Sequence, residues 1–399
     1  MIREDIIIED TTLRDGEQMP GVAFSKETKL KLHDLLIDAG VRWIDIGSPA
    51  MGGDELDFLK ALIARGSDAT LVVWNRAVKE DVETSINLGF KAIHMGFPAS
   101  DVLLKESVNK NRQWLLTQVK ELVRFAKDKG VFVSISSGDS ARVEIEFLKE
   151  FASIAYEEGA DRLRISDTTG AMTPESYFEK MASVAESCNM DLQCHCHNDF
   201  GFGLANTIAG LKAGARYFHV TVNGIGERAG MPDLAQTAMS LKYLYGRDVG
   251  IVGTKLPELS QAVSEATGHS VPPHQPIIGE NAFAHESGIH VDAVLRNPKA
   301  YEPPFSPEEV GGKRKYVIGK HSGRTLIQHI LNNNGIDVEK EDLWECLNEI
   351  KSLAIKQKGA VTEQQLLEIY DRIRSGNSQN ERSIHAPDGT KASLKLSNS

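Results

Sequence analysis

Short apolar segments alternate with longer amphipathic segments over about 245 residues of this chain, at a spacing of roughly 30 residues, the size of one strand–helix unit. Interpreted as strands, the apolar segments cover residues 6–13, 43–48, 70–74, 92–97, 132–136, 162–167, 192–197 and 217–222. Eight such units predict an α/β chain folded as a (β/α)8, or TIM, barrel. A doubly wound sheet usually carries a GxGxxG fingerprint after its first strand. Here the first strand ends in Thr-Leu-Arg-Asp-Gly-Glu-Gln, which favours the barrel.

The chain has 399 residues, more than one compact core usually takes, and its texture changes after about residue 265. Residues 271–276 are rich in Pro and residues 303–312 in Pro and Gly, which is typical of linkers. Residues 340–375 repeat apolar side chains at helical spacing. We expect a barrel over 1–265, a linker or lid subdomain over 266–330, a small helical subdomain over 331–375 and a disordered tail over 376–399.

Composition argues against several classes of protein. The net charge of −11 and the shortness of the densest basic run, Lys313-Arg314-Lys315, argue against nucleic-acid binding. The N-terminal segment lacks the apolar core of a signal peptide, and no apolar run approaches the length of a membrane helix. Four cysteines, two of them in one strand, do not form a secreted disulfide framework. We expect a reduced, cytoplasmic protein.

Two histidines alternate with two cysteines at the end of the seventh predicted strand, in Cys194-His195-Cys196-His197. Alternate residues of a strand point to the same side, so His195 and His197 project together and the cysteines face the other way. With Asp15, which follows the first strand, the two imidazoles can bind one divalent cation. Strands one and seven are near neighbours in an eight-stranded barrel, so Asp15 can reach them. The alternative is that both histidines are ordinary core or surface groups.

Two further polar clusters stand beside predicted elements. Arg14 follows the first strand, and its guanidinium can stabilise an oxyanion or hold a carboxylate. Residues 283–290, Phe-Ala-His-Glu-Ser-Gly-Ile-His, lie in the C-terminal appendage. Two histidines beside Glu and Gly can supply a general base, although a structural role is the usual one.

Four motifs together resemble one enzyme family: residues 10–18 (Asp-Thr-Thr-Leu-Arg-Asp-Gly-Glu-Gln), 195–199 (His-Cys-His-Asn-Asp), 223–230 (Asn-Gly-Ile-Gly-Glu-Arg-Ala-Gly) and 285–290 (His-Glu-Ser-Gly-Ile-His). They look like the acyl-CoA condensing enzymes, namely the isopropylmalate, citramalate and homocitrate synthases of the metal-dependent barrel lyase superfamily. The resemblance spans residues 5–330. Residues 49–52, 310–312 and 319–324 look most like the homocitrate synthases of nitrogen-fixing bacteria.

The resemblance implies a Claisen-type condensation of acetyl-CoA with a 2-oxo acid, followed by thioester hydrolysis and release of CoA. It implies Mg, Mn or Zn bound by Asp15, His195 and His197, with a lid over 266–330 that contributes to the active site. The implied catalytic residues are Arg14, His290 and Tyr316, and the implied substrate-binding residues are Gln18, Arg76, His94 and Thr168. It also implies a homodimer in which each C-terminal region covers its neighbour's barrel.

Two positions depart from the family pattern. Met231 stands where the family commonly has Asn near the metal, and Gly138 stands where it usually has Glu after the fifth strand. We expect 2-oxoglutarate as the substrate, giving homocitrate. The alternatives are 2-oxoisovalerate, pyruvate and 3-phosphonopyruvate. The last of these suits the loss of a carboxylate at Gly138.

Residues 226–233 lack the cysteine of hydroxymethylglutaryl-CoA lyases, which argues against a metal-dependent retro-aldol lyase. The intact motifs argue against an inactive relative.

Overall fold

Eight parallel strands close into a barrel within residues 1–384, the part of the chain that this computed structural model describes. The strands are β1 (Ile7–Asp10), β2 (Trp43–Asp45), β3 (Thr70–Arg76), β4 (Ala92–Pro98), β5 (Phe132–Gly138), β6 (Arg162–Asp167), β7 (Asp191–Cys196) and β8 (Tyr217–Val220). The register of β1 with β8, from Ile7 opposite Tyr217 to Asp10 opposite Val220, closes the ring. The predicted barrel is therefore confirmed, and each predicted strand overlaps an observed one.

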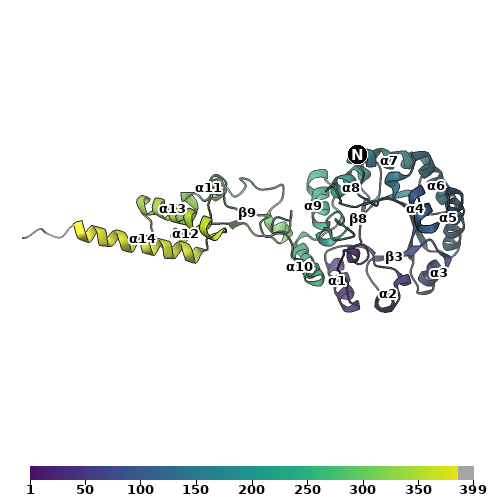
Figure 1. Ribbon diagram of the computed structural model, residues 1–399, viewed down its shortest axis with the longest axis horizontal. Helices are drawn as coiled ribbons and strands as arrows, with labels where there is room; N and C mark the ends of the chain where they lie inside the picture. Colours follow the sequence, from purple (N-terminus) through teal and green to yellow (C-terminus); the bar gives the residue numbers. More distant parts are fainter. Residues whose placement is uncertain (385–399) are drawn as a thin grey trace, which may run out of the picture. The chain divides into compact units, whose positions relative to one another are not determined.

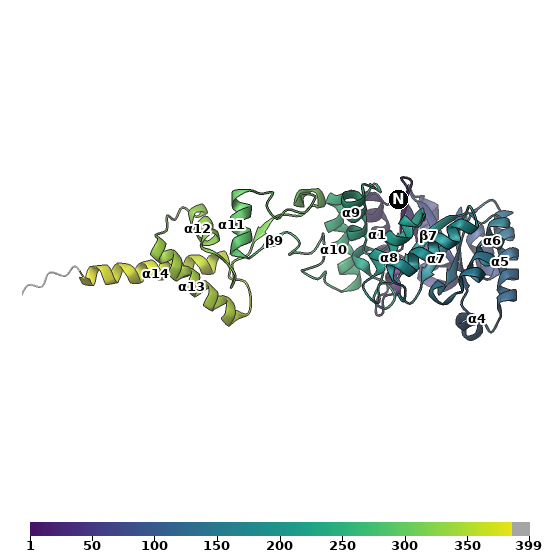
Figure 2. The ribbon, with the colours of Figure 1, turned by 90° about the horizontal axis from the view of Figure 1, so that it is seen from above.

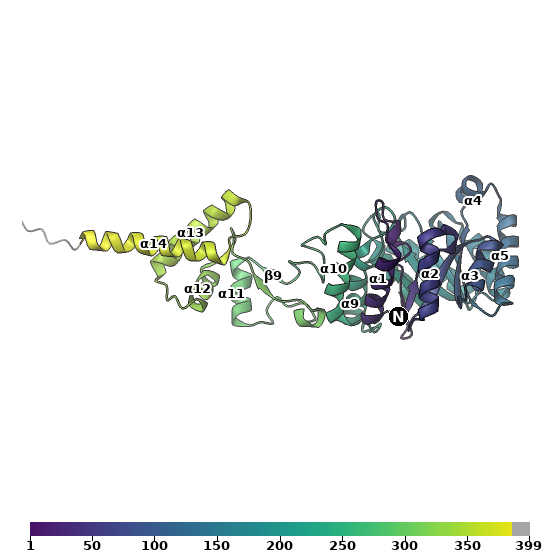
Figure 3. The same ribbon diagram turned by 90° about the horizontal axis from the view of Figure 1, so that it is seen from below.

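Helices follow the strands and surround the barrel, which Figure 1 shows end-on. The helices of this unit are α1 (Lys26–Asp38), α2 (Gly53–Arg65), α3 (Lys79–Asn87), α4 (Asp101–Val108), α5 (Arg112–Lys127), α6 (Ile145–Glu157), α7 (Pro174–Ser187), α8 (Gly203–Lys212), α9 (Leu234–Tyr245) and α10 (Leu256–Thr267). In Figures 2 and 3, α4 projects beyond the surrounding helices. Because α4 follows β4 directly, it stands at the carboxyl ends of the strands, where barrel enzymes keep their active sites.

A second compact unit contains Phe283–Ser306 and the described chain from Lys313 on, whereas the barrel unit contains Met1–Ala282 and Pro307–Gly312. Its elements are β9 (Ala284–His285), α11 (Gly288–Arg296), β10 (Lys315–Tyr316), α12 (Arg324–Asn333), α13 (Lys340–Gln357) and α14 (Glu363–Ile384). Apolar side chains of α11 to α14 form a core of their own. This unit thus has the packing of an independent domain.

The domain boundaries differ from the predicted ones at three places. The predicted boundary at 330/331 is absent, because residues on both sides of it share one apolar core. The barrel unit continues to Ala282 instead of ending at 265, and α10, at its C-terminal side, packs against α1. Helix α14 continues to Ile384, past residue 375, where the sequence predicted the start of a disordered tail. The rest of that predicted tail, residues 385–399, lies outside the described residues. Among the helices of residues 1–384, none combines the length and the apolarity that crossing a membrane requires.

The interior of the barrel carries ionisable side chains where such barrels usually hold Val, Ile or Leu. Glu9, Asp45, Arg162, Arg164 and His219 are all at most 2% exposed. Removing a charge from water costs several kcal/mol unless the charge is paired and hydrogen-bonded. A stable barrel therefore requires that these groups form ion pairs and hydrogen bonds with one another.

Arg162 and Glu9 form a fully buried ion pair. Arg162 Nη1 lies 2.5 Å from Glu9 Oε2, and neither side chain is exposed. The Arg162 guanidinium carbon also lies between 4.7 and 5.6 Å from the ring centres of Trp43, Phe132 and Tyr217. Aromatic faces stabilise a desolvated cation. A ring of aromatic side chains thus holds the arginine that neutralises Glu9.

The variant Arg162→Met keeps an apolar chain against the three rings but leaves the charge of Glu9 without its closest partner. We expect the free energy of unfolding, measured by urea denaturation, to fall by about 3–5 kcal/mol. Arg124→Met is the matched control, because Arg124 pairs with Glu158 from a side chain that is 60% exposed. That variant should lose less than about 1 kcal/mol. Equal losses would contradict the importance of the buried pair.

The cysteines of β7 face away from the barrel interior, as predicted. Cys194 and Cys196 are fully buried, and α8 packs over them through Gly210 and Thr207. Burial raises the pKa of the Cys196 thiol to about 12 and that of Cys346 to about 11, so neither forms a thiolate at neutral pH. Cys188 is partly exposed.

Titration of native protein with a chromogenic disulfide reagent at pH 8 should therefore detect one thiol per chain, that of Cys188. The remaining three should react only after denaturation, because burial disfavours their thiolates and blocks access. The variant Cys188→Ser should show no rapid reaction in the native state. Rapid reaction of Cys194 or Cys196 in wild-type protein would contradict this placement of β7.

Candidate active site

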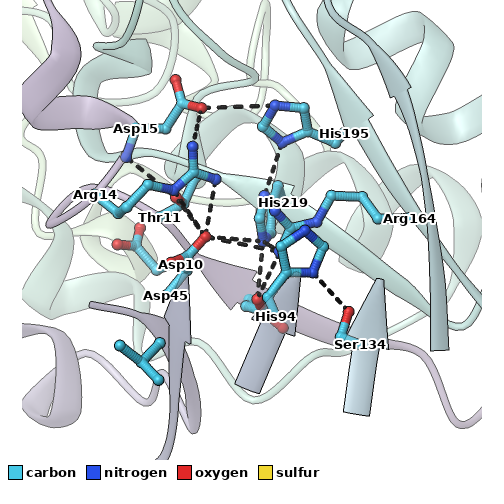
Figure 4. Close-up of polar contacts among 12 residues, drawn as sticks. Asp10, Thr11, Arg14, Asp15, Asp45, His94, Ser134, Arg164, His195 and His219 are labelled. Atoms are coloured by element: carbon cyan, nitrogen blue, oxygen red, sulfur yellow. Dashed lines mark hydrogen bonds and ion pairs between the residues drawn. The ribbon is translucent and has the colours of Figure 1, made fainter. Parts of the chain in front are cut away.

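Asp15, His195 and His197 meet at the carboxyl ends of the strands (Figure 4 shows Asp15 and His195). Their potential ligand atoms all lie within 4.8 Å of one another, with His195 Nε2 3.6 Å from Asp15 Oδ2. The two imidazole rings are 5.1 Å apart and nearly perpendicular. All three side chains are buried. The structure therefore brings together the three residues that the sequence singled out, although they come from opposite ends of the barrel sequence.

The chemistry of this cluster fits a divalent cation. Asp15 Oδ1 and His197 Nδ1 are buried and have no hydrogen-bond partner among the described residues. Burial lowers the pKa of both histidines, so their imidazoles are neutral and keep a lone pair for a ligand. One carboxylate and two imidazoles form a mixed O/N donor set that several divalent metals accept.

Arg14 joins this cluster to the charged interior of the barrel. Its Nη1 donates to Asp15 Oδ2 at 2.6 Å, and its Nε donates to Asp45 Oδ2 at 2.9 Å, as Figure 4 shows. Burial disfavours the charged form of Arg14, but the carboxylates of Asp45 and Asp15 outweigh burial and raise its pKa. Arg14 is therefore a fixed cation that orients the carboxylate of Asp15.

Sequence reasoning missed the residues behind the three predicted ligands. His219 Nδ1 lies 2.8 Å from His195 Nδ1, and Arg164 Nη2 lies 3.2 Å from His219 Nε2. Asp45 and Glu9 complete this layer of the barrel. A signal was available, because fully buried parallel strands rarely carry charges, and segments such as Arg162-Leu-Arg164 alternate charged with apolar residues.

Asp15, His195 and His197 line a cavity of about 310 Å³. Gln18 and Thr168, both predicted to bind substrate, line it. The loop after β8 adds Glu227 and Arg228, which belong to the motif over 223–230 but had no assigned role; Arg228 Nη2 donates to the carbonyl of Thr168 at 2.6 Å. Arg76 instead lines a neighbouring cavity of about 630 Å³, and its guanidinium pairs with Asp81.

The structure does not place His94 in the cavity, contrary to the prediction. His94 is fully buried, and its Nδ1 lies 2.9 Å from Ser134 Oγ inside the barrel. It is the third residue of β4, whereas Gly96, two residues further along the same face, lines the cavity. The sequence predicted that His94 lies at the carboxyl end of its strand. It lies two residues before Gly96, the residue of the same face that reaches the cavity.

The two positions that depart from the family pattern both lie at the cavity or behind it. Gly138 lines the cavity, and a Cβ added there would approach the Phe97 carbonyl oxygen to 3.0 Å. Met231 is buried, and its Cγ lies 3.2 Å from the position that a Cβ on Gly226 would take. That position is equally 3.2 Å from Asp15 Oδ1. Met231 and Asp15 therefore both border Gly226 in the loop after β8.

His290 and Tyr316 lie in the second unit. The ring of His290 is exposed and stacks on Tyr301 at 4.0 Å, with His285 6.2 Å away. Tyr316 stands opposite His285 where β9 and β10 pair. Folding of this unit therefore gathers His285, His290 and Tyr316 near one short strand pair.

Comparison with known proteins identifies the family. The profile of the HMGL-like family matches residues 5–263, and the homocitrate synthase post-HMGL domain-like profile matches residues 277–358. The chain is 57% identical over 371 residues to the 2-phosphonomethylmalate synthase of Streptomyces rubellomurinus, which covers 93% of this chain and 99% of that protein. It is 41% identical to 2-isopropylmalate synthase 2 of Caldanaerobacter subterraneus (92% of this chain, 96% of that protein). It is also 41% identical to homocitrate synthase 1 of Nostoc sp. (92% and 98%).

Among solved structures, the HMG-CoA lyase of Bacillus subtilis matches with a TM-score of 0.62 at 20% identity, over 68% of this chain and 96% of the lyase. This likeness shows the barrel fold alone. The related sequences identify the family as well as the fold, and they confirm the resemblance that the motifs indicated. The chain belongs to the HMGL-like family, among the metal-dependent synthases that condense acetyl-CoA with a 2-oxo acid.

Proposed function

We propose that this protein condenses acetyl-CoA with 3-phosphonopyruvate, giving 2-phosphonomethylmalate and CoA. The observation that carries the proposal is the 57% identity to the 2-phosphonomethylmalate synthase of Streptomyces rubellomurinus, against 41% to the isopropylmalate and homocitrate synthases compared above. The match covers 99% of that protein, so both units of the chain are included.

The cavity wall at Gly138 supports this choice of substrate. Glycine places no carboxylate there, in contrast to the family pattern, and no side chain enters the cavity from that position. Arg14, Arg164 and Arg228 line the same cavity. A phosphonate carries up to two negative charges and is bulkier than a carboxylate, so removing an acidic side chain relieves both repulsion and crowding.

Within this proposal, each residue of the site has a role. Asp15, His195 and His197 hold Mg, Mn or Zn, and the bound cation supplies Lewis acidity toward the ketone of the oxo acid. Arg14 stabilises the oxyanion that forms when the ketone is attacked. Gln18 and Thr168 bind the oxo acid from the cavity wall. Arg76 contacts substrate from the neighbouring cavity.

The acetyl group has its own acid–base residues in this proposal. His290, with Tyr316 as partner, removes a methyl proton of acetyl-CoA, and the resulting enolate carbon forms the new bond to the ketone carbon. Water then cleaves the thioester, releasing CoA. The gathering of His285, His290 and Tyr301 in one unit supports a site there.

By resemblance to the family, we further propose a cytoplasmic homodimer in which the second unit of each chain contributes to the active site of its neighbour's barrel. We propose that neither nucleic acid nor membrane is a partner.

2-Oxoglutarate is the second candidate substrate. The homocitrate synthase profile at residues 277–358 and the 41% identity to the Nostoc enzyme favour it. The residue that distinguishes the two candidates is Gly138, because 2-oxoglutarate is longer and carries a carboxylate in place of the phosphonate.

A panel of 2-oxo acids assayed for acetyl-CoA-dependent thiol release tests the substrate. We expect kcat/KM to be highest with 3-phosphonopyruvate and at least tenfold lower with 2-oxoglutarate, 2-oxoisovalerate and pyruvate, a difference of about 1.4 kcal/mol. Chelator-treated protein should release no CoA until Mg, Mn or Zn is added. Absence of turnover with 3-phosphonopyruvate would refute the proposed substrate, and full activity after chelation would refute the metal site.

Gly138→Glu tests the role of the missing carboxylate, with Gly138→Gln as its uncharged isostere. Both variants crowd the Phe97 carbonyl equally, so only charge distinguishes them. With 3-phosphonopyruvate we expect kcat/KM of the Glu variant to be about tenfold or more below that of the Gln variant, since like charges within a cavity repel. Pyruvate, which lacks the second anion, should show nearly equal values in both. If kcat/KM were equal in the Glu and Gln variants with both substrates, crowding and not charge would explain the loss of activity.

A further inference from the structure

A chain of buried hydrogen-bonding groups leads from the proposed metal ligands into the barrel. His195 Nδ1 lies 2.8 Å from His219 Nδ1, and His219 Nε2 lies 2.9 Å from Glu9 Oε1 (Figure 4 shows the two histidines). Neither His219 nor Glu9 is exposed. The family motifs include neither residue, and nothing in the proposed reaction uses them directly.

The His195–His219 contact and the His219–Glu9 contact each need one hydrogen-bonding proton, and the charge of Glu9 determines which atom carries it. Glu9 Oε2 accepts a hydrogen bond from Arg162 Nη1 at 2.5 Å, and Arg164 Nη2 lies 3.5 Å from Glu9 Oε1. Although burial opposes it, these two arginines lower the pKa of Glu9, so the carboxylate accepts and cannot donate. His219 must then carry its proton on Nε2, which leaves its Nδ1 as an acceptor. His195 must in turn donate from Nδ1, which leaves the lone pair on Nε2, the atom that faces Asp15.

Arg164 favours the opposite arrangement, because its Nη2 lies 3.2 Å from His219 Nε2 and can only donate. If His219 accepted that bond, its proton would move to Nδ1, and His195 would carry its proton on Nε2, unable to bind a metal through that atom. The carboxylate contact is shorter, and an unprotonated nitrogen facing a carboxylate oxygen at 2.9 Å would be repulsive. Arg164 also has other acceptors, with its Nε donating to Gln193 Oε1 at 2.9 Å.

We propose that Glu9 and His219 are positioning residues that hold His195 in the tautomer whose Nε2 lone pair points toward Asp15. They thereby set the affinity of the site for its divalent cation. The proposal rests on the metal site of the proposed function and deepens it. Residues that orient a metal-bound histidine commonly change metal affinity by about 10–100-fold.

Metal binding to apo protein, measured by isothermal titration calorimetry with Mn²⁺ or Zn²⁺, tests the proposal without an activity assay. His219→Leu removes the acceptor for His195 Nδ1–H, and we expect Kd to rise at least about tenfold. His219→Asn is the matched variant, because its side-chain carbonyl can take the place of the Nδ1 acceptor; its Kd should stay within about threefold of wild type. Equal Kd values in wild type and His219→Leu would overturn the proposal.

Asp15→Asn separates this idea from the metal site itself. If Asp15→Asn weakens binding strongly while His219→Leu does not, the metal site stands and the positioning chain fails. If Asp15→Asn leaves binding unchanged, the metal site of the proposed function fails, and the positioning proposal fails with it.

A second measurement does not depend on how the variants fold. ¹⁵N chemical shifts of wild-type apo protein with labelled histidine report which ring nitrogen is protonated. His195 should carry its proton on Nδ1 and His219 on Nε2. The reverse assignment for either ring would overturn the proposal.

Discussion

The structure depends on the neutralisation of Glu9 inside the barrel. This carboxylate has no access to water, and Arg162, Arg164 and His219 surround it. In the low-dielectric interior an unpaired charge would cost several kcal/mol, which is a large part of the marginal stability of a domain. The strands that bring these partners together, β1, β6 and β8, must therefore adopt one register relative to one another.

The same network connects packing to chemistry. One layer contains Arg162 among aromatic rings, the next contains Glu9, Asp45, Arg164 and His219, and the layer at the carboxyl ends contains the ligand cluster. Arg14 ties Asp15 to Asp45, and His219 ties His195 to Glu9. Two of the three proposed ligands, Asp15 and His195, are thus oriented by groups that belong to the buried polar network of the barrel, which is how a rigid scaffold preorganises a site.

The departures from the family pattern fall outside this network. Gly138 belongs to the cavity wall and Met231 to the loop behind Asp15, while Arg14, Asp15, His195 and His197 are intact. Groups that activate the ketone are shared by all substrates of such a reaction, whereas the groups that contact the rest of the oxo acid decide which substrate fits. A family can therefore keep one chemistry and change its substrate at the cavity wall.

The sequence alone determined the eight strand–helix units, since periodicity and strand length are local properties that persist in the fold. It also determined that His195 and His197 share one face and that the cysteines between them do not, because alternation follows from strand geometry. Tertiary structure decided how deep each inward-facing residue sits. His94 lies below the cavity, and Asp45, Arg164 and His219 lie behind the proposed metal ligands, because depth depends on register and tilt across strands far apart in the chain. It also decided that the second unit begins after Ala282, because that boundary depends on which helices pack together.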